Sequence, residues 1–182
     1  MSEKNKLSNR LRSKFEQQTK CDLSQLKKEI EKTKIQKIPL SSIKINHILK
    51  CCPNFIGCFP EDLLPQSIVS FPCFLIVNTD HSKMEGSHWI ALGIFENKIE
   101  VFDPLGFQIL NWPRIPCHLL SFLKSFSLSR KIIISKRLQS DTSILCGFYC
   151  IYYVVYREFL SWTNIQDSFS DTNDTTLIKF FK

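Results

Sequence analysis

The chain has 182 residues, 43% of them hydrophobic, and a net charge of +7 at pH 7. That length and composition predict a single domain with one substantial core. The longest apolar run, from Ile144 to Tyr156, spans thirteen residues and is too short to cross a bilayer. Because the first residues are hydrophilic, we expect no secretory signal peptide and therefore a soluble, intracellular protein that does not engage a membrane.

The positive charge is concentrated at the N-terminus. Residues 1–40 contain eleven Lys or Arg and five Asp or Glu, a balance of +6, whereas the other 142 residues contain thirteen against twelve. Such a basic segment either binds nucleic acid or another polyanion, or is simply a solvated helix, and the composition leaves both interpretations open. We predict a basic helical N-terminal arm over residues 1–40 and one folded domain over residues 41–182.

Eight cysteines are spread along the chain. Without a secretory route they are expected to be free thiols, because disulfides are rare in reducing compartments. No two of them have the spacing Cys-x-x-Cys, and no cluster of histidines has the spacing of a zinc site. The sequence therefore predicts no metal site.

The first half of the chain predicts helices followed by strands. Apolar residues at helical spacing predict one or two helices within residues 1–37, and Ser41 is a candidate cap for a helix from Ser42 to Cys51. The glycine and prolines between Asn54 and Pro65 predict an irregular segment. Three apolar runs predict strands: Phe71–Asn78, Trp89–Phe95 and Ile99–Phe102. Residues 96–98 predict a hairpin turn between the second and the third.

The second half predicts a mixed arrangement around one long apolar helix. Its expected elements are a helix over Cys117–Phe126 with Leu119, Leu120 and Leu123 facing inward, a strand over Lys131–Ser135, a helix over Cys146–Trp162, and one short helix within Thr163–Lys182. Together with the first half, this pattern predicts an α+β fold with a mixed central sheet and a buried helix.

The loop that starts at Gln139 leads directly into Cys146 and Gly147. This order places Cys146 in the first helical turn, where unpaired backbone N–H groups favour a thiolate. Gly147 allows a substrate backbone to approach closely. Gln139 supplies a side-chain N–H that faces a developing oxyanion beside the Cys146 amide. The alternative is that Cys146 is an inert core cysteine, as expected for Cys150.

A reactive cysteine needs a proton acceptor, usually histidine. Three of the four histidines lie in helix-like or loop segments and are expected at the surface: His47, His81 and His118. His88 instead stands where a polar loop enters an apolar strand, just before Trp89, a candidate cleft residue. Asp103, followed by Pro104, is the candidate acceptor for the His88 ring.

Strand register decides whether His88 and Asp103 meet. A hairpin turn at residues 97–98 would set Asp103 opposite Leu92, about four residues or roughly 13 Å from His88 along the strand. A turn shifted toward Phe95 or a bulge at Gly93 would narrow that gap.

These motifs resemble the adenovirus-type cysteine proteases (adenain), a family related in fold to the Ulp/SENP-type SUMO proteases. The resemblance covers Ile43 to Trp162 and lies in Gly-Ser-His-Trp from Gly86, Phe-Asp-Pro-Leu-Gly-Phe from Phe102, and the glutamine seven residues before Cys-Gly. That glutamine spacing favours the adenain-like branch, found in adenoviruses and in Polinton or adintovirus-type elements.

The resemblance implies a papain-like or adenain-like fold and a role for each motif residue. His88 becomes the general base and acid, Asp103 its orienting group, Cys146 the nucleophile and Gln139 the oxyanion donor. Family members cleave virion precursor proteins next to glycine, so capsid or virion precursors are the expected substrates. We expect a monomer, located in the virion and the host nucleus if the chain is viral.

The resemblance also implies how the activity is regulated. No cofactor is required, but DNA or a peptide is expected to activate the enzyme, and the basic arm is the candidate DNA-binding segment. The adenoviral activating peptide is bound through a cysteine in a region that corresponds to Leu128–Ser135, which contains none here. Two other functions remain open: an isopeptidase acting on SUMO or ubiquitin, and a non-catalytic, protease-like module that binds nucleic acid through its arm.

Overall fold

The computed structural model describes residues 28, 39–106, 116–169 and 174–181. Within these residues, five strands form one sheet in the order β1-β2-β3-β4-β5. The strands are β1 (Phe55–Pro60), β2 (Cys73–Asn78), β3 (Trp89–Ile94), β4 (Lys98–Phe102) and β5 (Lys131–Ile134). The two outer pairs are parallel and the two inner pairs antiparallel, which confirms the predicted mixed sheet.

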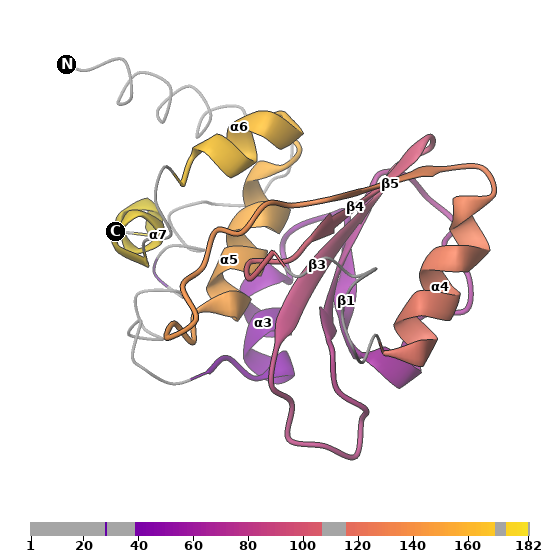
Figure 1. Ribbon diagram of the computed structural model, residues 1–182, viewed down its shortest axis with the longest axis horizontal. Coiled ribbons are helices and arrows are strands. Elements are labelled where there is room, and N and C mark those ends of the chain that lie inside the picture. Colours follow the sequence, from indigo (N-terminus) through magenta and orange to yellow (C-terminus); the bar gives the residue numbers. More distant parts are fainter. Residues whose placement is uncertain (1–27, 29–38, 107–115, 170–173, 182) are drawn as a thin grey trace.

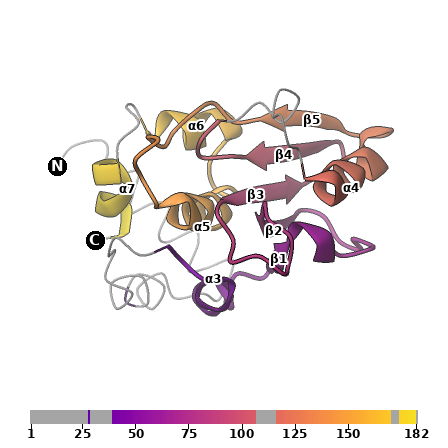
Figure 2. The same ribbon diagram turned by 60° about the horizontal axis from the view of Figure 1, so that its bottom comes forward.

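Helices cover both faces of this sheet (Figures 1 and 2). On one face lies α4 (Cys117–Ser127), and on the other lie α3 (Ser42–Leu49), α5 (Cys146–Tyr156), α6 (Trp162–Asp167) and α7 (Asp174–Phe181). The resulting α+β fold has three layers, and α5 is the central helix of the thicker side.

Alternation along the strands builds two separate cores, because successive side chains of a strand point to opposite faces. In β2, Phe74 and Ile76 belong to the core under α5, whereas Leu75 and Val77 belong to the core under α4. Leu119 and Leu123 of α4 are buried as predicted, but Leu120 is only partly buried. A strand buried on both faces is hydrophobic throughout, and β2 shows this.

The predicted helix over Cys146–Trp162 is wrong in length, because α5 ends at Tyr156. Arg157 turns away to bind the buried Glu100, and its Nη1 donates to the carbonyl of Leu160 at 2.8 Å. Ser161 then accepts a hydrogen bond from the Asn164 N–H and caps α6. The tail consequently holds two short helices, α6 and α7, where one was predicted.

The segment Asn54–Pro65 is also corrected, because it contains a strand and a short 3-10 helix rather than an irregular run. β1 pairs in parallel with β2, and its register shifts between Phe55 and Gly57. Gly57 has φ +143°, which accommodates that shift, and Pro60 closes the strand at the edge of the sheet. Gly57 and Pro60, which led to the prediction of an irregular segment, therefore belong to an edge strand with an irregular register. The helix η1 (Glu61–Leu63) follows directly.

Other predictions near the N-terminus have mixed outcomes. Ser41 caps α3 through its side chain as predicted. The helices expected within residues 1–37 lie outside the described residues, apart from the helical Lys28. Six cysteines are free thiols, but Cys51 is disulfide-bonded, so the expectation of free thiols is wrong for that residue. The rarity of disulfides in reducing compartments does not indicate which two cysteines a fold brings within bonding distance. In the part of the chain that the structure describes, no helix is long and apolar enough to span a membrane.

Candidate active site

The hairpin of β3 and β4 brings His88 and Asp103 together. Its turn lies at residues 96–97, one residue nearer Phe95 than the turn at residues 97–98, since the N–H of Phe95 donates to the Lys98 carbonyl at 2.9 Å. The last pair of the ladder is Ala91 with Phe102. Asp103 therefore falls opposite Ile90, two residues from His88 and on the same face. The two-residue change in register brings Asp103 close enough to His88 for a hydrogen bond between their side chains.

His88 bridges a carboxylate and a thiol. Its Nε2 lies 2.8 Å from Oδ1 of the fully buried Asp103, which leaves Nδ1 for the hydrogen bond with Cys146. Burial alone lowers the pKa of His88, but the hydrogen bonds and negative charges of Asp103 and Cys146 outweigh it and raise the pKa to about 9. The arrangement favours an imidazolium beside the Cys146 sulfur.

Asp103 is fixed by its own backbone and by Ser135. The Asp103 N–H donates to the Ser135 hydroxyl at 2.9 Å, and that hydroxyl donates back to the Asp103 carbonyl at 2.8 Å. The N–H of Leu105 donates to Oδ1 at 3.0 Å. Gly106 then closes the turn with φ +64°, and a Cβ there would lie 2.5 Å from the Arg137 backbone. The carboxylate is thereby held with one oxygen aimed at the imidazole.

Cys146 begins α5, as the sequence predicted. No side chain caps this helix, and its first-turn bonds start with the N–H of Phe148, which donates to the Leu145 carbonyl. Within the described residues, the backbone N–H groups of Cys146 and Gly147 meet no hydrogen-bond acceptor. They are donors for an anion formed at the thiol. Cys150, one turn later, differs because complete burial raises the pKa of its thiol well above the ordinary value.

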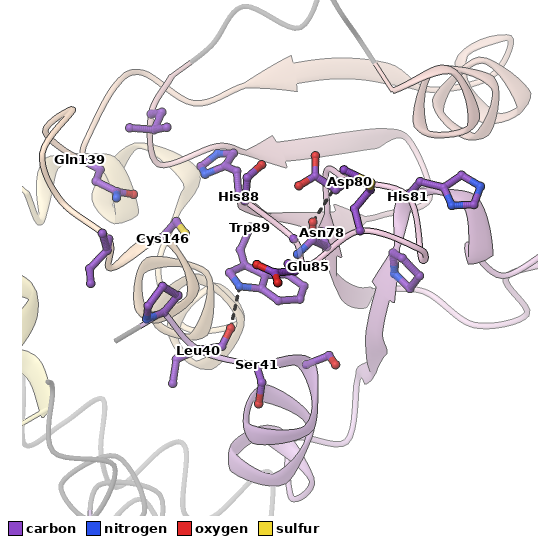
Figure 3. A pocket seen from close by; sticks show the side chains of 18 of the residues that line it. Leu40, Ser41, Asn78, Asp80, His81, Glu85, His88, Trp89, Gln139 and Cys146 are labelled. Carbon is purple, nitrogen blue, oxygen red and sulfur yellow. Dashed lines mark hydrogen bonds between the residues drawn. The ribbon is translucent and has the colours of Figure 1, made fainter. Parts of the chain in front are cut away.

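Gln139 lies beside Cys146 and His88 in Figure 3 and is 1% exposed. Its backbone N–H donates to the Pro104 carbonyl at 2.8 Å, which ties the Gln139 loop to the Asp103 turn. Its Nε2 donates one hydrogen to the Ser143 carbonyl at 2.7 Å. An amide nitrogen carries two hydrogens, so the second remains available to a substrate oxygen.

A cleft of about 710 Å³ runs over these residues, with His88, Trp89 and Cys146 between its two sides. The loop between β2 and β3 forms one side, and the Gln139 loop forms the other (Figure 3). Trp89 is 8% exposed, so it packs in the core and also lines the cleft.

The cleft carries negative charge. Among the described residues, its lining includes the carboxylates of Asp80, Glu85 and Asp141 and no lysine or arginine, although Asp141 is paired with Arg137 outside the lining. An acidic peptide or a nucleic-acid backbone is therefore disfavoured in this cleft.

Two sets of hydrogen bonds that hold residues of the site in place were not predicted from the sequence. The indole Nε1 of Trp89 donates to the Leu40 carbonyl at 2.9 Å. Ser143, in the loop before Cys146, donates to the Asp174 carboxylate of α7 at 2.8 Å, and Tyr149 donates to the same oxygen at 3.2 Å. Neither partner stands near the catalytic motifs in sequence, so no local spacing indicates these contacts.

Comparison with known proteins fits this geometry. A model of the adenovirus endoprotease family matches residues 55–175, well over half of the chain. The chain belongs to the adenovirus endoprotease family. As a member it is a cysteine-type peptidase with protein substrates, and peptidases of this type generally need no cofactor. The sequence has no match among curated proteins.

Solved structures were also compared with this chain. The ASFV protease is 19% identical with a TM-score of 0.52, over 80% of this chain and 67% of that chain. The SUMO protease Ulp1 is 16% identical with a TM-score of 0.33, over 88% of this chain and 77% of that chain. The first likeness shows a shared fold, and the second is too distant to compare individual residues.

Proposed function

We propose that this adenovirus endoprotease family member is an endopeptidase that cleaves capsid or virion precursor proteins of a virus or a Polinton-type element next to glycine. The observation that carries the proposal is the hydrogen bonding of His88 to both Asp103 and Cys146 at the floor of an open cleft. A protein with this role acts in the virion and the host nucleus.

In the proposed reaction, the Cys146 thiolate attacks the carbonyl carbon of the scissile peptide. The carbonyl oxygen becomes an oxyanion that accepts hydrogen bonds from the Cys146 backbone N–H and the Gln139 side chain. His88 gives its proton to the leaving amine as the C–N bond breaks, and Asp103 keeps the ring oriented. His88 then takes a proton from water, which attacks the thioester and releases the acid and the thiol.

The walls of the cleft support a small residue beside the scissile bond. A Cβ on Gly147 would stand 3.2 Å from Leu40 and 3.4 Å from the Trp89 ring, so both side chains pack closely against the backbone of the residue after the nucleophile. A glycine in the substrate allows its backbone to approach this crowded segment without a side-chain clash. The acidic lining further favours neutral or basic substrate segments.

Replacing the nucleophile tests this proposal. Cys146→Ala is expected to abolish cleavage of a glycine-containing capsid-type peptide, with a fall of at least about 10³-fold, because no other group forms the acyl-enzyme. Cys58→Ala, at a free thiol outside the cleft lining, is the matched control and should cleave like the unmodified chain. An active Cys146→Ala protein would contradict the mechanism.

A second assay separates the alternative peptidase function. A fluorogenic substrate carrying a ubiquitin-like or SUMO C-terminus is compared with the capsid-type peptide at equal concentration. We expect kcat/KM to favour the capsid-type peptide. The reverse order would assign the enzyme to isopeptidase chemistry while leaving Cys146 as its nucleophile.

A further inference from the structure

A carboxylate, a thiol and an imidazole meet where α4 begins, outside the cleft. Glu61 of η1, together with Cys117 and His118 of α4, presents donor atoms that lie within 4.8 Å of one another. The proposed peptidase mechanism uses none of the three. Glu61 and Cys117 come from different elements, and α4 lies on the opposite face of the sheet from α5 (Figure 1).

The distances between the donor atoms are those of ligands around one small ion. Nδ1 of His118 lies 3.5 Å from Sγ of Cys117, and 3.0 and 3.1 Å from the two oxygens of Glu61. A tetrahedral zinc ion, with bonds of about 2.3 Å to sulfur and about 2.0–2.2 Å to nitrogen or oxygen, holds S and N about 3.5 Å apart and N and O about 3.4 Å apart. The distances from the His118 nitrogen therefore differ from that geometry by at most a few tenths of an ångström, and the thiol and the carboxylate lie within 4.8 Å of each other.

The charge of Glu61 also indicates a missing cation. This residue is 6% exposed, and within the described part of the chain its carboxylate accepts from the ring and the backbone N–H of His118 alone. Among the described residues, no lysine or arginine pairs with it. A buried carboxylate is costly unless a cation or strong donors compensate it, and an imidazole is a cation only when protonated.

We propose that Glu61, Cys117 and His118 bind one Zn²⁺ ion, with water as the fourth ligand. Cys117 and His118 are exposed, so an ion reaches the site directly from solvent. Thiolate and imidazole ligands select zinc rather than magnesium or calcium. Binding releases the thiol proton of Cys117 to solvent, and two anionic ligands then neutralise the divalent ion.

The ion would fasten the start of α4 to the cleft wall. Glu61 follows Pro60, which lines the cleft, and its N–H donates to the carbonyl of Asp80 at 3.3 Å in the loop on one side. Zinc at this position therefore stabilises the folded domain and takes no part in the reaction. The proposal is independent of the peptidase mechanism.

Zinc titration of the full chain tests the site. The experiment uses Cys146→Ala protein, so that the Cys146–His88 pair does not compete for metal, with ZnCl₂ alone as the ligand in isothermal calorimetry. We expect one Zn²⁺ per chain at micromolar or tighter affinity. Adding Cys117→Ser or His118→Ala should each weaken binding at least about tenfold, since each removes a ligand. His47→Ala, at an exposed histidine on α3, should leave the affinity unchanged.

Cobalt provides a second readout that identifies the sulfur ligand. Co²⁺ bound to the Cys146→Ala chain should show a thiolate-to-metal charge-transfer band, which Cys117→Ser should lose. Circular dichroism verifies that each variant is folded, as expected for substitutions at two exposed side chains. Equal zinc affinity with and without Cys117, or binding only at millimolar zinc, would overturn the proposal. Peptidase activity of the unmodified chain, measured with and without a chelator, separates this result from any failure of the catalytic assignment.

Discussion

His88 contacts a carboxylate on one side and a thiol on the other, and these contacts decide when its ring is charged. Its pKa of about 9 lies above the ordinary 6.5, so the folded protein binds this proton more tightly than the unfolded chain. The resulting stabilisation is complete below about pH 6.5 and is lost as the pH rises through about 9. The imidazolium form of His88 is therefore favoured at neutral and mildly acidic pH.

Alkylation by iodoacetamide should reveal the charged pair of His88 and Cys146. At about pH 6 and with a chelator present, Cys146 should be labelled at least about tenfold faster than the exposed Cys117, because the His88 imidazolium and the free N–H groups at the start of α5 favour negative charge on its sulfur. In His88→Ala the advantage should vanish, and labelling should rise only near about pH 8.5, like an ordinary thiol. Mass spectrometry of the digested protein measures both sites in one sample. Equal rates at pH 6 in the unmodified chain would refute the charged pair.

Gln139 is expected to act on the transition state rather than on substrate binding. Gln139→Ala removes the side-chain donor but keeps the backbone bond to Pro104. We expect kcat to fall about 10²–10³-fold while KM changes little, as for removal of one oxyanion donor. Steady-state kinetics on the capsid-type peptide measure both constants. A rise in KM with unchanged kcat would instead make Gln139 a binding residue.

At the scale of elements, one buried ion pair connects the central helix to the sheet. Arg157, just beyond α5, binds both oxygens of Glu100 in β4 at 2.6 Å, and Tyr153 donates to the same carboxylate at 2.8 Å. Glu100 is fully buried, so it cannot exchange these partners for water. Among the described residues, the partners of Glu100 that would remain without Arg157 are Lys98, at 2.9 Å, and the neutral Tyr153 hydroxyl.

Arg157→Met should therefore lower the free energy of unfolding by about 3 kcal/mol, the scale of breaking a buried pair. Lys136→Met is the control, because Lys136 and Asp167 form an exposed pair with side chains 53% and 60% exposed. That change should be close to neutral. Urea unfolding followed by tryptophan fluorescence measures both variants. Equal effects would show that the buried network contributes no more than a surface ion pair.

The same elements show what sequence patterns determine. Alternation and apolar runs predicted β2, β3 and β4, which are almost entirely buried, and the partly buried, isoleucine-rich β5. Periodicity missed β1, an edge strand with a register shift, and extended α5 past Arg157, whose turn depends on the distant Glu100. Whether His88 and Asp103 meet depends on the pairing of β3 with β4. Moving the hairpin turn by one residue changes that pairing by two residues, and composition alone does not fix the position of the turn.

At the scale of the whole molecule, the charge is divided between the arm and the cleft. Residues 1–40 carry a balance of +6, whereas the cleft lining, as far as the structure describes it, has carboxylates and no lysine or arginine. We propose that nucleic acid, where it binds, contacts the arm and leaves the cleft open to peptide. The proposed zinc site also depends on the whole molecule, since Glu61 and Cys117 are far apart in sequence and only the fold brings them together.

Duplex DNA binding should depend steeply on salt if the arm neutralises phosphates. In the full chain, replacing arm lysines with glutamine should reduce the slope of log affinity against log salt by about 0.9 for each phosphate that is no longer neutralised. Fluorescence anisotropy at several salt concentrations measures the slope. An unchanged slope would show that the arm does not bind the DNA backbone.

The anchoring of the Gln139 loop by α7 makes the active site depend on a segment far from it in sequence. Ser143 and Tyr149 both donate to Asp174, so the loop that precedes Cys146 loses its carboxylate anchor when α7 is displaced. The strands beside His88 and Asp103 and the helix that begins at Cys146 do not include α7. A chain cut before Asp174 would therefore keep its thiol, imidazole and carboxylate but would have no anchored oxyanion loop.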